Sequence, residues 1–157
     1  FSSLGAQLLD AQVLDLFAGS GSLGLEALSR GAKCVRFVET GHRALDALKE
    51  NVVGLGLEEQ TEIAQTDALN ESAWRSSGGE QRGWADVVFM DPPYPMVQGR
   101  ERGEVLAACE ALMRDVMTHE GVLVLHAPKG ALDTAEFADS LSTDERVYGS
   151  TSIWYLR

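Results

Sequence analysis

Several features that this sequence lacks narrow the kinds of protein it can be. It has no run of about eighteen or more apolar residues, so we expect no membrane-spanning helix. Its first residues, 1–5, resemble neither a secretory signal nor a transit peptide. Its two cysteines, Cys34 and Cys109, lie in apolar patterns without disulfide or metal-ligand spacing. We therefore expect buried thiols in a reducing compartment, a cytoplasmic location and no metal site.

Positive charge is also scarce. The chain has 13 Lys and Arg against 24 Asp and Glu, which gives a net charge of −11 at pH 7. Such a protein has no overall attraction for nucleic acid, so binding to RNA needs a local basic rim. Five side chains are expected on loops at one end of the sheet, either as that rim or as ordinary solvated charges: Arg75, Arg82, Arg100, Arg102 and Lys129.

We expect the 157 residues, 45% of them hydrophobic, to form a single domain over 1–157, because the sequence has no repeat and no linker. Strand and helix patterns alternate along it. Strands are predicted at 12–17, 33–38, 61–65, 85–90 and 122–126, and helices at 22–30, 41–53, 101–119 and 134–141. Two more strands, 145–148 and 152–156, flank a turn at Gly149-Ser150. This order predicts an α/β fold with a doubly wound, mainly parallel sheet and an antiparallel C-terminal hairpin.

A glycine-rich loop follows the first strand. Gly19, Gly21 and Gly24 have G-x-G-x-x-G spacing and lie between a strand and a helix pattern. Glycine lets a ligand approach the backbone, and the start of a helix offers unpaired N–H groups to a negative atom. The loop is therefore a candidate ligand site, with a plain tight turn as the alternative.

Asp15 precedes this loop and bears on the choice of ligand. Its carboxylate would repel the pyrophosphate of a dinucleotide. S-adenosylmethionine has no phosphate but carries an ammonium, a sulfonium and one carboxylate, which suit an acid beside exposed N–H groups. Alternatively, Asp15 holds the loop by accepting hydrogen bonds from backbone N–H groups.

Three more acids stand at expected strand ends. Glu39 lies twenty residues after Gly19, where an acid can accept hydrogen bonds from ribose hydroxyls. Asp67 is a candidate for an adenine amino group, with the Ala68 N–H facing a ring nitrogen. Asp91 ends the fourth strand. Solvated or helix-capping acids are the alternative for each.

Asp91 opens the segment Asp91-Pro92-Pro93-Tyr94. The prolines fix the backbone and remove two N–H donors, which leaves a stiff turn with outward carbonyls. Asp91 and the Pro92 carbonyl can accept from an exocyclic amino group while Tyr94 stacks on the ring. Such positioning aims the nitrogen lone pair at a donor methyl group, and it stays open whether Asp91 also takes the released proton. The alternative is a proline-rich turn with a core tyrosine.

These motifs together resemble a known superfamily. Asp15-x-Phe17-Ala18-Gly19-Ser20-Gly21 followed by Asp91-Pro92-Pro93-Tyr94 resembles the class I S-adenosylmethionine-dependent methyltransferases that modify an amino nitrogen. Within them, residues 14–32 and the ending Tyr148-Gly149-x-Thr151-x-Ile153 are similar to the RsmD family. Members of that family are bacterial 16S rRNA guanine-N2 methyltransferases with a Rossmann-like fold.

The resemblance implies roles for individual residues. It places the acceptor base at Asp91, Pro92, Pro93 and Tyr94. It places the cofactor, S-adenosyl-L-methionine, at Asp15, Phe17, Gly19, Ser20, Gly21, Glu39, Asp67 and Ala68. The family begins with a segment containing an Arg-Pro-Thr motif, expected to help close the cofactor site and touch RNA; we expect that segment to be missing here. His126 stands where the family more often has an acid, and we expect no catalytic role for it.

The function expected from the sequence is N2-methylation of a guanine in 16S rRNA, presented within the small ribosomal subunit or an assembly intermediate. One alternative is methylation of a protein glutamine amide, which usually has Asn in place of Asp91. Others are a nucleotide-binding module or dehydrogenase, and a cofactor-binding scaffold without catalysis.

Overall fold

The computed structural model describes residues 3–75, 78–79, 82–137 and 142–157. Its strands are β1 (Gln12–Leu16), β2 (Cys34–Glu39), β3 (Thr61–Gln65), β4 (Ala85–Met90), β5 (Met117–Pro128), β6 (Thr143–Tyr148) and β7 (Thr151–Leu156). Its α-helices are α1 (Ser22–Ser29), α2 (His42–Leu55), α3 (Tyr94–Gln98) and α4 (Arg102–Ala111). The strands form one sheet in the order β3-β2-β1-β4-β5-β7-β6.

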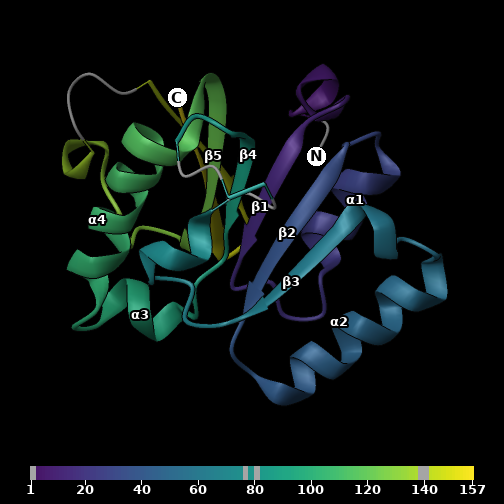
Figure 1. The fold of residues 1–157 in the computed structure, drawn as a ribbon. Helices are drawn as coiled ribbons and strands as arrows, with labels where there is room; N and C mark the ends of the chain where they lie inside the picture. The colour runs from purple at the N-terminus through teal and green to yellow at the C-terminus, as the bar shows by residue number, and fades with distance from the viewer. Residues whose placement is uncertain (1–2, 76–77, 80–81, 138–141) are drawn as a thin grey trace.

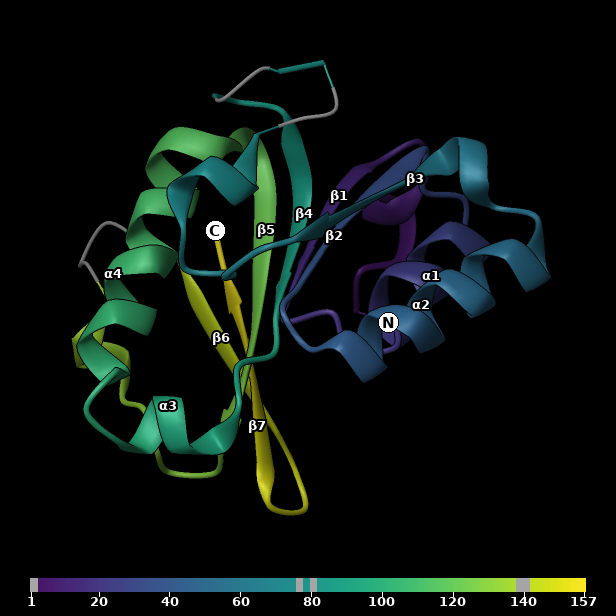
Figure 2. The same ribbon diagram turned by 60° about the horizontal axis from the view of Figure 1, so that its bottom comes forward.

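The sheet has the predicted doubly wound arrangement. Strands β1 to β5 pair in parallel, whereas β7 runs antiparallel to both β5 and β6. Helices α1 and α2 lie on one face of the sheet, and α3 and α4 lie on the other (Figures 1 and 2). The α/β class, the parallel sheet and the antiparallel C-terminal hairpin are therefore confirmed.

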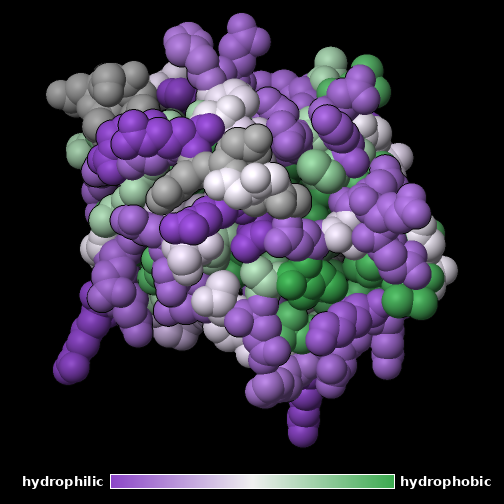
Figure 3. Space-filling model, viewed as in Figure 1, coloured by the Kyte–Doolittle hydropathy of each residue, from purple (hydrophilic) through white to green (hydrophobic). Residues whose placement is uncertain are grey.

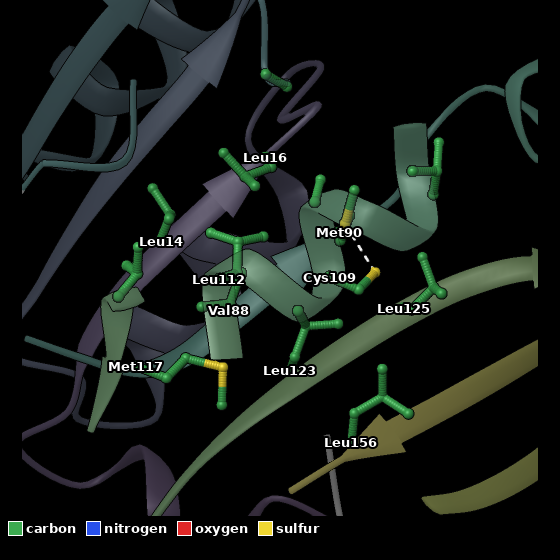
Figure 4. Packing of buried hydrophobic residues seen from close by; sticks show 14 of the residues in the cluster. Leu14, Leu16, Val88, Met90, Cys109, Leu112, Met117, Leu123, Leu125 and Leu156 are labelled. Carbon is green, nitrogen blue, oxygen red and sulfur yellow. Dashed lines mark hydrogen bonds between the residues drawn. The ribbon is translucent and has the colours of Figure 1, made fainter. Parts of the chain in front are cut away.

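Each face of the sheet packs its own apolar cluster. Side chains alternate along a strand, so Val13 of β1 joins the cluster under α1 and α2 while its neighbour Leu14 joins the cluster under α4. In the second cluster Leu14 packs near Leu112, and the Cys109 thiol contacts the Met90 sulfur at 3.5 Å (Figure 4). Burial raises the pKa of Cys109 to about 12, so this thiol stays protonated and acts as core.

The predicted helix at 101–119 is too long at its C-terminal end. The α-helix stops at Ala111, a single π-helical turn covers Leu112–Val116, and β5 begins at Met117. Pairing of Met117 with Ala85 of β4 draws the next residues into the sheet, so Gly121 lies in the strand instead of ending the helix. Tertiary pairing here overrides a helical sequence pattern.

The other predicted boundaries fit more closely. β3 and β4 have the predicted limits, and a 3-10 turn covers Glu71–Trp74. The predicted helix at 134–141 is seen only as a 3-10 turn at Thr134–Glu136, and residues 138–141 lie outside the described residues. Gly149 turns the hairpin with a φ of 61°, which glycine adopts without strain.

The surface is mainly hydrophilic in the view of Figure 3, with apolar side chains gathered between β3 and α2. Among the described residues, none of the helices has both the length and the apolar character that a membrane crossing requires. Over the same residues there is no group of three or more His, Cys, Asp or Glu side chains able to hold a metal ion.

Gly24 provides a test of how closely α1 packs on the sheet. A Cβ at Gly24 would lie 2.4 Å from the Phe37 ring and 2.8 Å from Val35 Cγ1, both in β2. We expect Gly24→Ala to lower the free energy of unfolding by about 1–3 kcal/mol, measured by urea denaturation. Gly54→Ala in α2 is the control, because its Cβ would meet nothing within 4 Å. It should raise stability by about 0.5–1 kcal/mol, and equal stability of the two variants would refute this packing.

Candidate cofactor and substrate site

A cleft of about 580 Å³ opens at the carboxyl ends of the parallel strands. It lies where the sheet order reverses, since the chain leaves β1 toward one face and β4 toward the other (Figure 2). Its lining consists of Phe17, Glu39, Thr40, Asp67, Asp91, Pro92, Pro93, Tyr94 and Met96. The structure thus gathers the predicted acids Glu39, Asp67 and Asp91 around one cavity. The remaining predicted site residues, Asp15, Gly19, Ser20, Gly21 and Ala68, are not part of this lining.

The glycine-rich loop is held in a strained backbone shape. Phe17 has a φ of 59°, a left-handed conformation that is costly for a residue with a Cβ. Gly19 and Gly21 also have positive φ values, but their surroundings differ. A Cβ at Gly21 would lie 2.3 Å from Leu48, whereas one at Gly19 would meet nothing within 4 Å. The positive φ and the Leu48 side chain together favour glycine at Gly21, while Gly19 keeps bare backbone beside open space.

Asp15 is buried beneath this loop, with 1% of its surface exposed. Its Oδ2 accepts a hydrogen bond of 2.9 Å from the Gly24 N–H in the first turn of α1. This contact is the one that the loop-holding alternative requires. Burial raises the pKa of Asp15 to about 8, and the nearby carboxylates Asp91 and Glu39 push it in the same direction. A cationic ligand in the cleft would relieve this crowding of negative charge.

Glu39 ties the glycine loop to the end of β2. Its Oε2 accepts from the Gly19 N–H at 2.8 Å, and its Oε1 accepts from the N–H groups of Thr40 and Gly41. A carboxylate has about four lone-pair sites, so Oε2 retains one toward the cleft. Glu39 can therefore orient the loop and still accept from a ligand hydroxyl.

Asp67 and Ala68 follow β3 on the far side of the cleft. Asp67 Oδ1 accepts from the Leu69 N–H at 2.9 Å, which shapes a local turn. The Ala68 carbonyl accepts from the Trp74 indole N–H at 2.8 Å, and the Trp74 carbonyl accepts from Trp84. Two buried tryptophans thus fix the segment that carries Asp67.

The Asp91-Pro92-Pro93-Tyr94 segment forms the opposite wall. Pro92 is buried, whereas Asp91 and Tyr94 are exposed to the cleft side. The Pro93 carbonyl accepts from the Met96 N–H at 2.9 Å in the first turn of α3. Pro93 is therefore the N-cap of this helix, and Pro92 lies before it. All four residues of the segment therefore line the cleft.

Two contacts near this wall were not predicted from the sequence. The Tyr94 hydroxyl and the Thr151 hydroxyl are 2.7 Å apart, and His126 Nδ1 lies 3.5 Å from Asp91 Oδ1. The second contact is an ion pair only when His126 is protonated. Both partners come from the C-terminal strands β5 and β7, far along the chain. The motif containing Thr151 was noted only for its resemblance, and nothing in its spacing indicates a contact with Tyr94.

Known proteins are similar to this chain in both sequence and fold. The profile of the family described as Conserved hypothetical protein 95 matches residues 1–157. The chain belongs to this family. Ribosomal RNA small subunit methyltransferase D of Haemophilus influenzae is 39% identical over 95 residues, which are 60% of this chain and 47% of that protein. The resemblance to the RsmD family is therefore confirmed.

Two further relatives match over greater lengths. The protein YlbH of Bacillus subtilis is 29% identical over 155 residues, covering 98% of this chain and 79% of that protein. A conserved hypothetical protein of Streptococcus pyogenes has a solved structure with a TM-score of 0.75 and 31% identity. That match covers 94% of this chain and 86% of the other. The chain spans about half the length of the small subunit methyltransferase that it matches.

The five basic side chains considered for a rim, with ordinary solvated charges as the alternative, do not all lie at the carboxyl ends of the strands. Arg102 turns inward, where it pairs with Glu136 and donates to the Ala131 carbonyl. Arg82 precedes the amino end of β4 and lies 3.7 Å from Asp115 at the end of the helix region, so it is on the opposite side from the cleft. Arg75 follows Trp74, whose carbonyl bonds to Trp84 at that same amino end. Only Arg100 and Lys129 of the predicted set remain on loops at the carboxyl ends of the strands.

Proposed function

We propose that this protein is an S-adenosylmethionine-dependent N-methyltransferase acting on the exocyclic N2 of a guanine in 16S rRNA. The observation that carries the proposal is the sharing of one cleft by Asp91, Tyr94, Glu39 and Asp67. An acceptor wall and a nucleoside-binding wall thus face each other. The name of the Haemophilus influenzae relative supports small-subunit rRNA as the substrate class.

The chemistry of the cleft fits the proposed cofactor. Its volume of about 580 Å³ is within the usual range for small-molecule sites. Repulsion from the nearby carboxylates Asp91 and Glu39 adds to the effect of burial in raising the pKa of Asp15. A ligand that carries an ammonium and a sulfonium reduces that repulsion, whereas a pyrophosphate increases it. Open space at Gly19 leaves its backbone accessible to the amino-acid part of the ligand.

The residues of this chain have distinct tasks in that reaction. Glu39 accepts from the ribose hydroxyls, and Asp67 and Ala68 hold the adenine. When bound, S-adenosylmethionine supplies an electrophilic methyl group. Asp91 and the Pro92 carbonyl accept hydrogen bonds from the guanine N2 amino group, and the Tyr94 ring stacks on the base. This grip turns the nitrogen lone pair toward the methyl donor, so catalysis comes mainly from positioning.

The substrate is tested with ribosomal subunits that lack the methylation. The full-length protein is incubated with these subunits, or with protein-free 16S rRNA, and with a radiolabelled methyl donor. We expect label on the N2 of one guanine, and stronger labelling of subunits than of free rRNA, because the acidic protein has little general attraction for RNA. Label on a protein glutamine, or no label on rRNA, would overturn the proposal.

Cofactor choice distinguishes this function from that of a dehydrogenase or nucleotide-binding module. We expect S-adenosylhomocysteine to bind with a Kd in roughly the micromolar range, and NAD to show no measurable binding, because its pyrophosphate meets the carboxylates of the cleft. Isothermal titration calorimetry with both ligands measures the difference. Preference for NAD would contradict the assignment of the cleft.

A further inference from the structure

We propose that Thr151 is a positioning residue for the acceptor base, acting through the ring of Tyr94. This inference rests on the proposed function, in which Tyr94 stacks on the guanine. The hydroxyl groups of Thr151 and Tyr94 lie 2.7 Å apart, so they form a hydrogen bond between residues 57 positions apart in the chain. It joins the C-terminal hairpin to the wall of the cleft.

The Tyr94 ring is only partly enclosed by packing. It is 42% exposed, and it lies at the first position of α3, a helix of five residues without a side-chain cap. An aromatic side chain that is not enclosed by packing can occupy more than one staggered rotamer. One hydrogen bond at the far end of the ring can therefore decide which rotamer faces the cleft.

Thr151, by contrast, is fixed by the sheet. It is the first residue of β7, and it pairs with Tyr148 of β6 on one side and with Pro128 of β5 on the other. The Lys129 N–H donates to the Ser150 carbonyl at 2.9 Å and so ties the turn of the hairpin to the end of β5. A β-branched side chain is also stiff at χ1. The Thr151 hydroxyl is thus a fixed point from which Tyr94 can be aligned.

Two residues of the acceptor wall, Asp91 and Tyr94, are then positioned by different parts of the sheet. Asp91 follows directly from β4, whose pairing with β1 and β5 fixes it. Tyr94 is fixed from the antiparallel hairpin. The separation between the Asp91 carboxylate and the Tyr94 ring, and hence the tilt of a flat base held between them, depends on the Thr151 hydroxyl. Errors of tilt misalign the nitrogen with the methyl group and lower kcat more than they raise KM.

Thr151→Val removes the hydroxyl but keeps the shape of the side chain, and Thr151→Ser keeps the hydroxyl. On undermethylated subunits we expect Thr151→Val to lower kcat about 3- to 10-fold, the effect of one lost hydrogen bond, with KM changed less than about 2-fold. Thr151→Ser should retain kcat within about 2-fold of the unmodified protein. Tyr94→Phe and the double variant should lose no more than Thr151→Val alone, because the same bond is removed each time. Additive losses, or equal losses in the valine and serine variants, would overturn the inference.

A second measurement does not depend on the substrate. The chain has three tyrosines, so fluorine NMR of protein carrying 3-fluorotyrosine gives few signals, and the Tyr94 signal is the one lost in Tyr94→Phe. We expect this signal to shift and broaden in Thr151→Val and to remain in place in Thr151→Ser. If the unmodified protein fails to methylate subunits, the proposed function falls, and this spectrum still decides whether Thr151 holds the Tyr94 ring. An unchanged Tyr94 signal in Thr151→Val refutes it.

Discussion

Asp91→Ala is expected to lower kcat for methyl transfer by about 10²- to 10³-fold while leaving S-adenosylhomocysteine affinity within about 3-fold. Asp91 lines the cleft, and in the proposed function its carboxylate accepts a hydrogen bond from the amino group that is methylated. Loss of this acceptor leaves the nitrogen free to rotate away from the methyl group. Single-turnover methylation of subunits measures the rate, and calorimetry measures cofactor binding.

Two controls separate the role of Asp91 from a loss of charge or of folding. Asp46→Ala removes an exposed carboxylate on α2, away from the cleft lining, and should leave the rate unchanged. Asp91→Asn keeps an oxygen acceptor without the negative charge, so we expect a rate between those of the alanine variant and the unmodified protein. Full activity of Asp91→Ala would refute the acceptor role of this wall.

Asp15→Asn is expected to make the free protein more stable at alkaline pH and to weaken its binding of the cofactor. The folded state raises the pKa of Asp15 from its usual value of 3.8 to about 8, chiefly because the carboxyl group is buried. Between these two pH values the folded protein keeps a proton that the unfolded chain has lost. The contribution of Asp15 to stability is therefore full below about pH 4 and declines as the pH rises to about 8.

An asparagine at this position carries no charge, and its side-chain oxygen can still accept from the Gly24 N–H. The Tm difference between Asp15→Asn and the unmodified protein should therefore increase from pH 5 to pH 9 and correspond to a few kcal/mol at pH 9, roughly as the pKa shift implies. Thermal unfolding followed by circular dichroism at several pH values measures it. A Tm difference that does not vary with pH would show that Asp15 is not buried in its protonated form.

The same substitution tests what the buried acid is for. A group that costs stability at the pH of activity is expected to serve function. If the Asp15 carboxylate meets the ammonium of the cofactor, its loss should weaken S-adenosylhomocysteine binding at least about 10-fold. Unchanged affinity would limit Asp15 to its contact with Gly24.

Features that depend on nearby residues were the ones that the sequence predicted well. The turn at Gly19 and Gly21, the limits of β3 and β4, and the stiff corner after Asp91 all follow from local patterns of glycine, proline and apolar residues. The gathering of Glu39, Asp67 and Asp91 followed from a topological rule, because parallel strands bring their carboxyl ends to one edge.

Features that depend on distant contacts were missed or misplaced. Arg102 was expected at a basic rim, but a partner 34 residues later, Glu136, draws it inward. The extension of β5 back to Met117 depends on pairing with β4, which a helical apolar pattern conceals. The bond between Tyr94 and Thr151 requires the hairpin to be placed against α3, and a periodic pattern holds no information on that docking.

A crystal structure of the full-length protein with S-adenosylhomocysteine would show whether one cleft holds the methyl donor against the acceptor corner. We expect the adenine beside Asp67, the ribose hydroxyls on Glu39, and the sulfur facing Asp91 and the Pro92 carbonyl. A ligand bound elsewhere, or a sulfur directed away from Asp91 and Tyr94, would contradict the account.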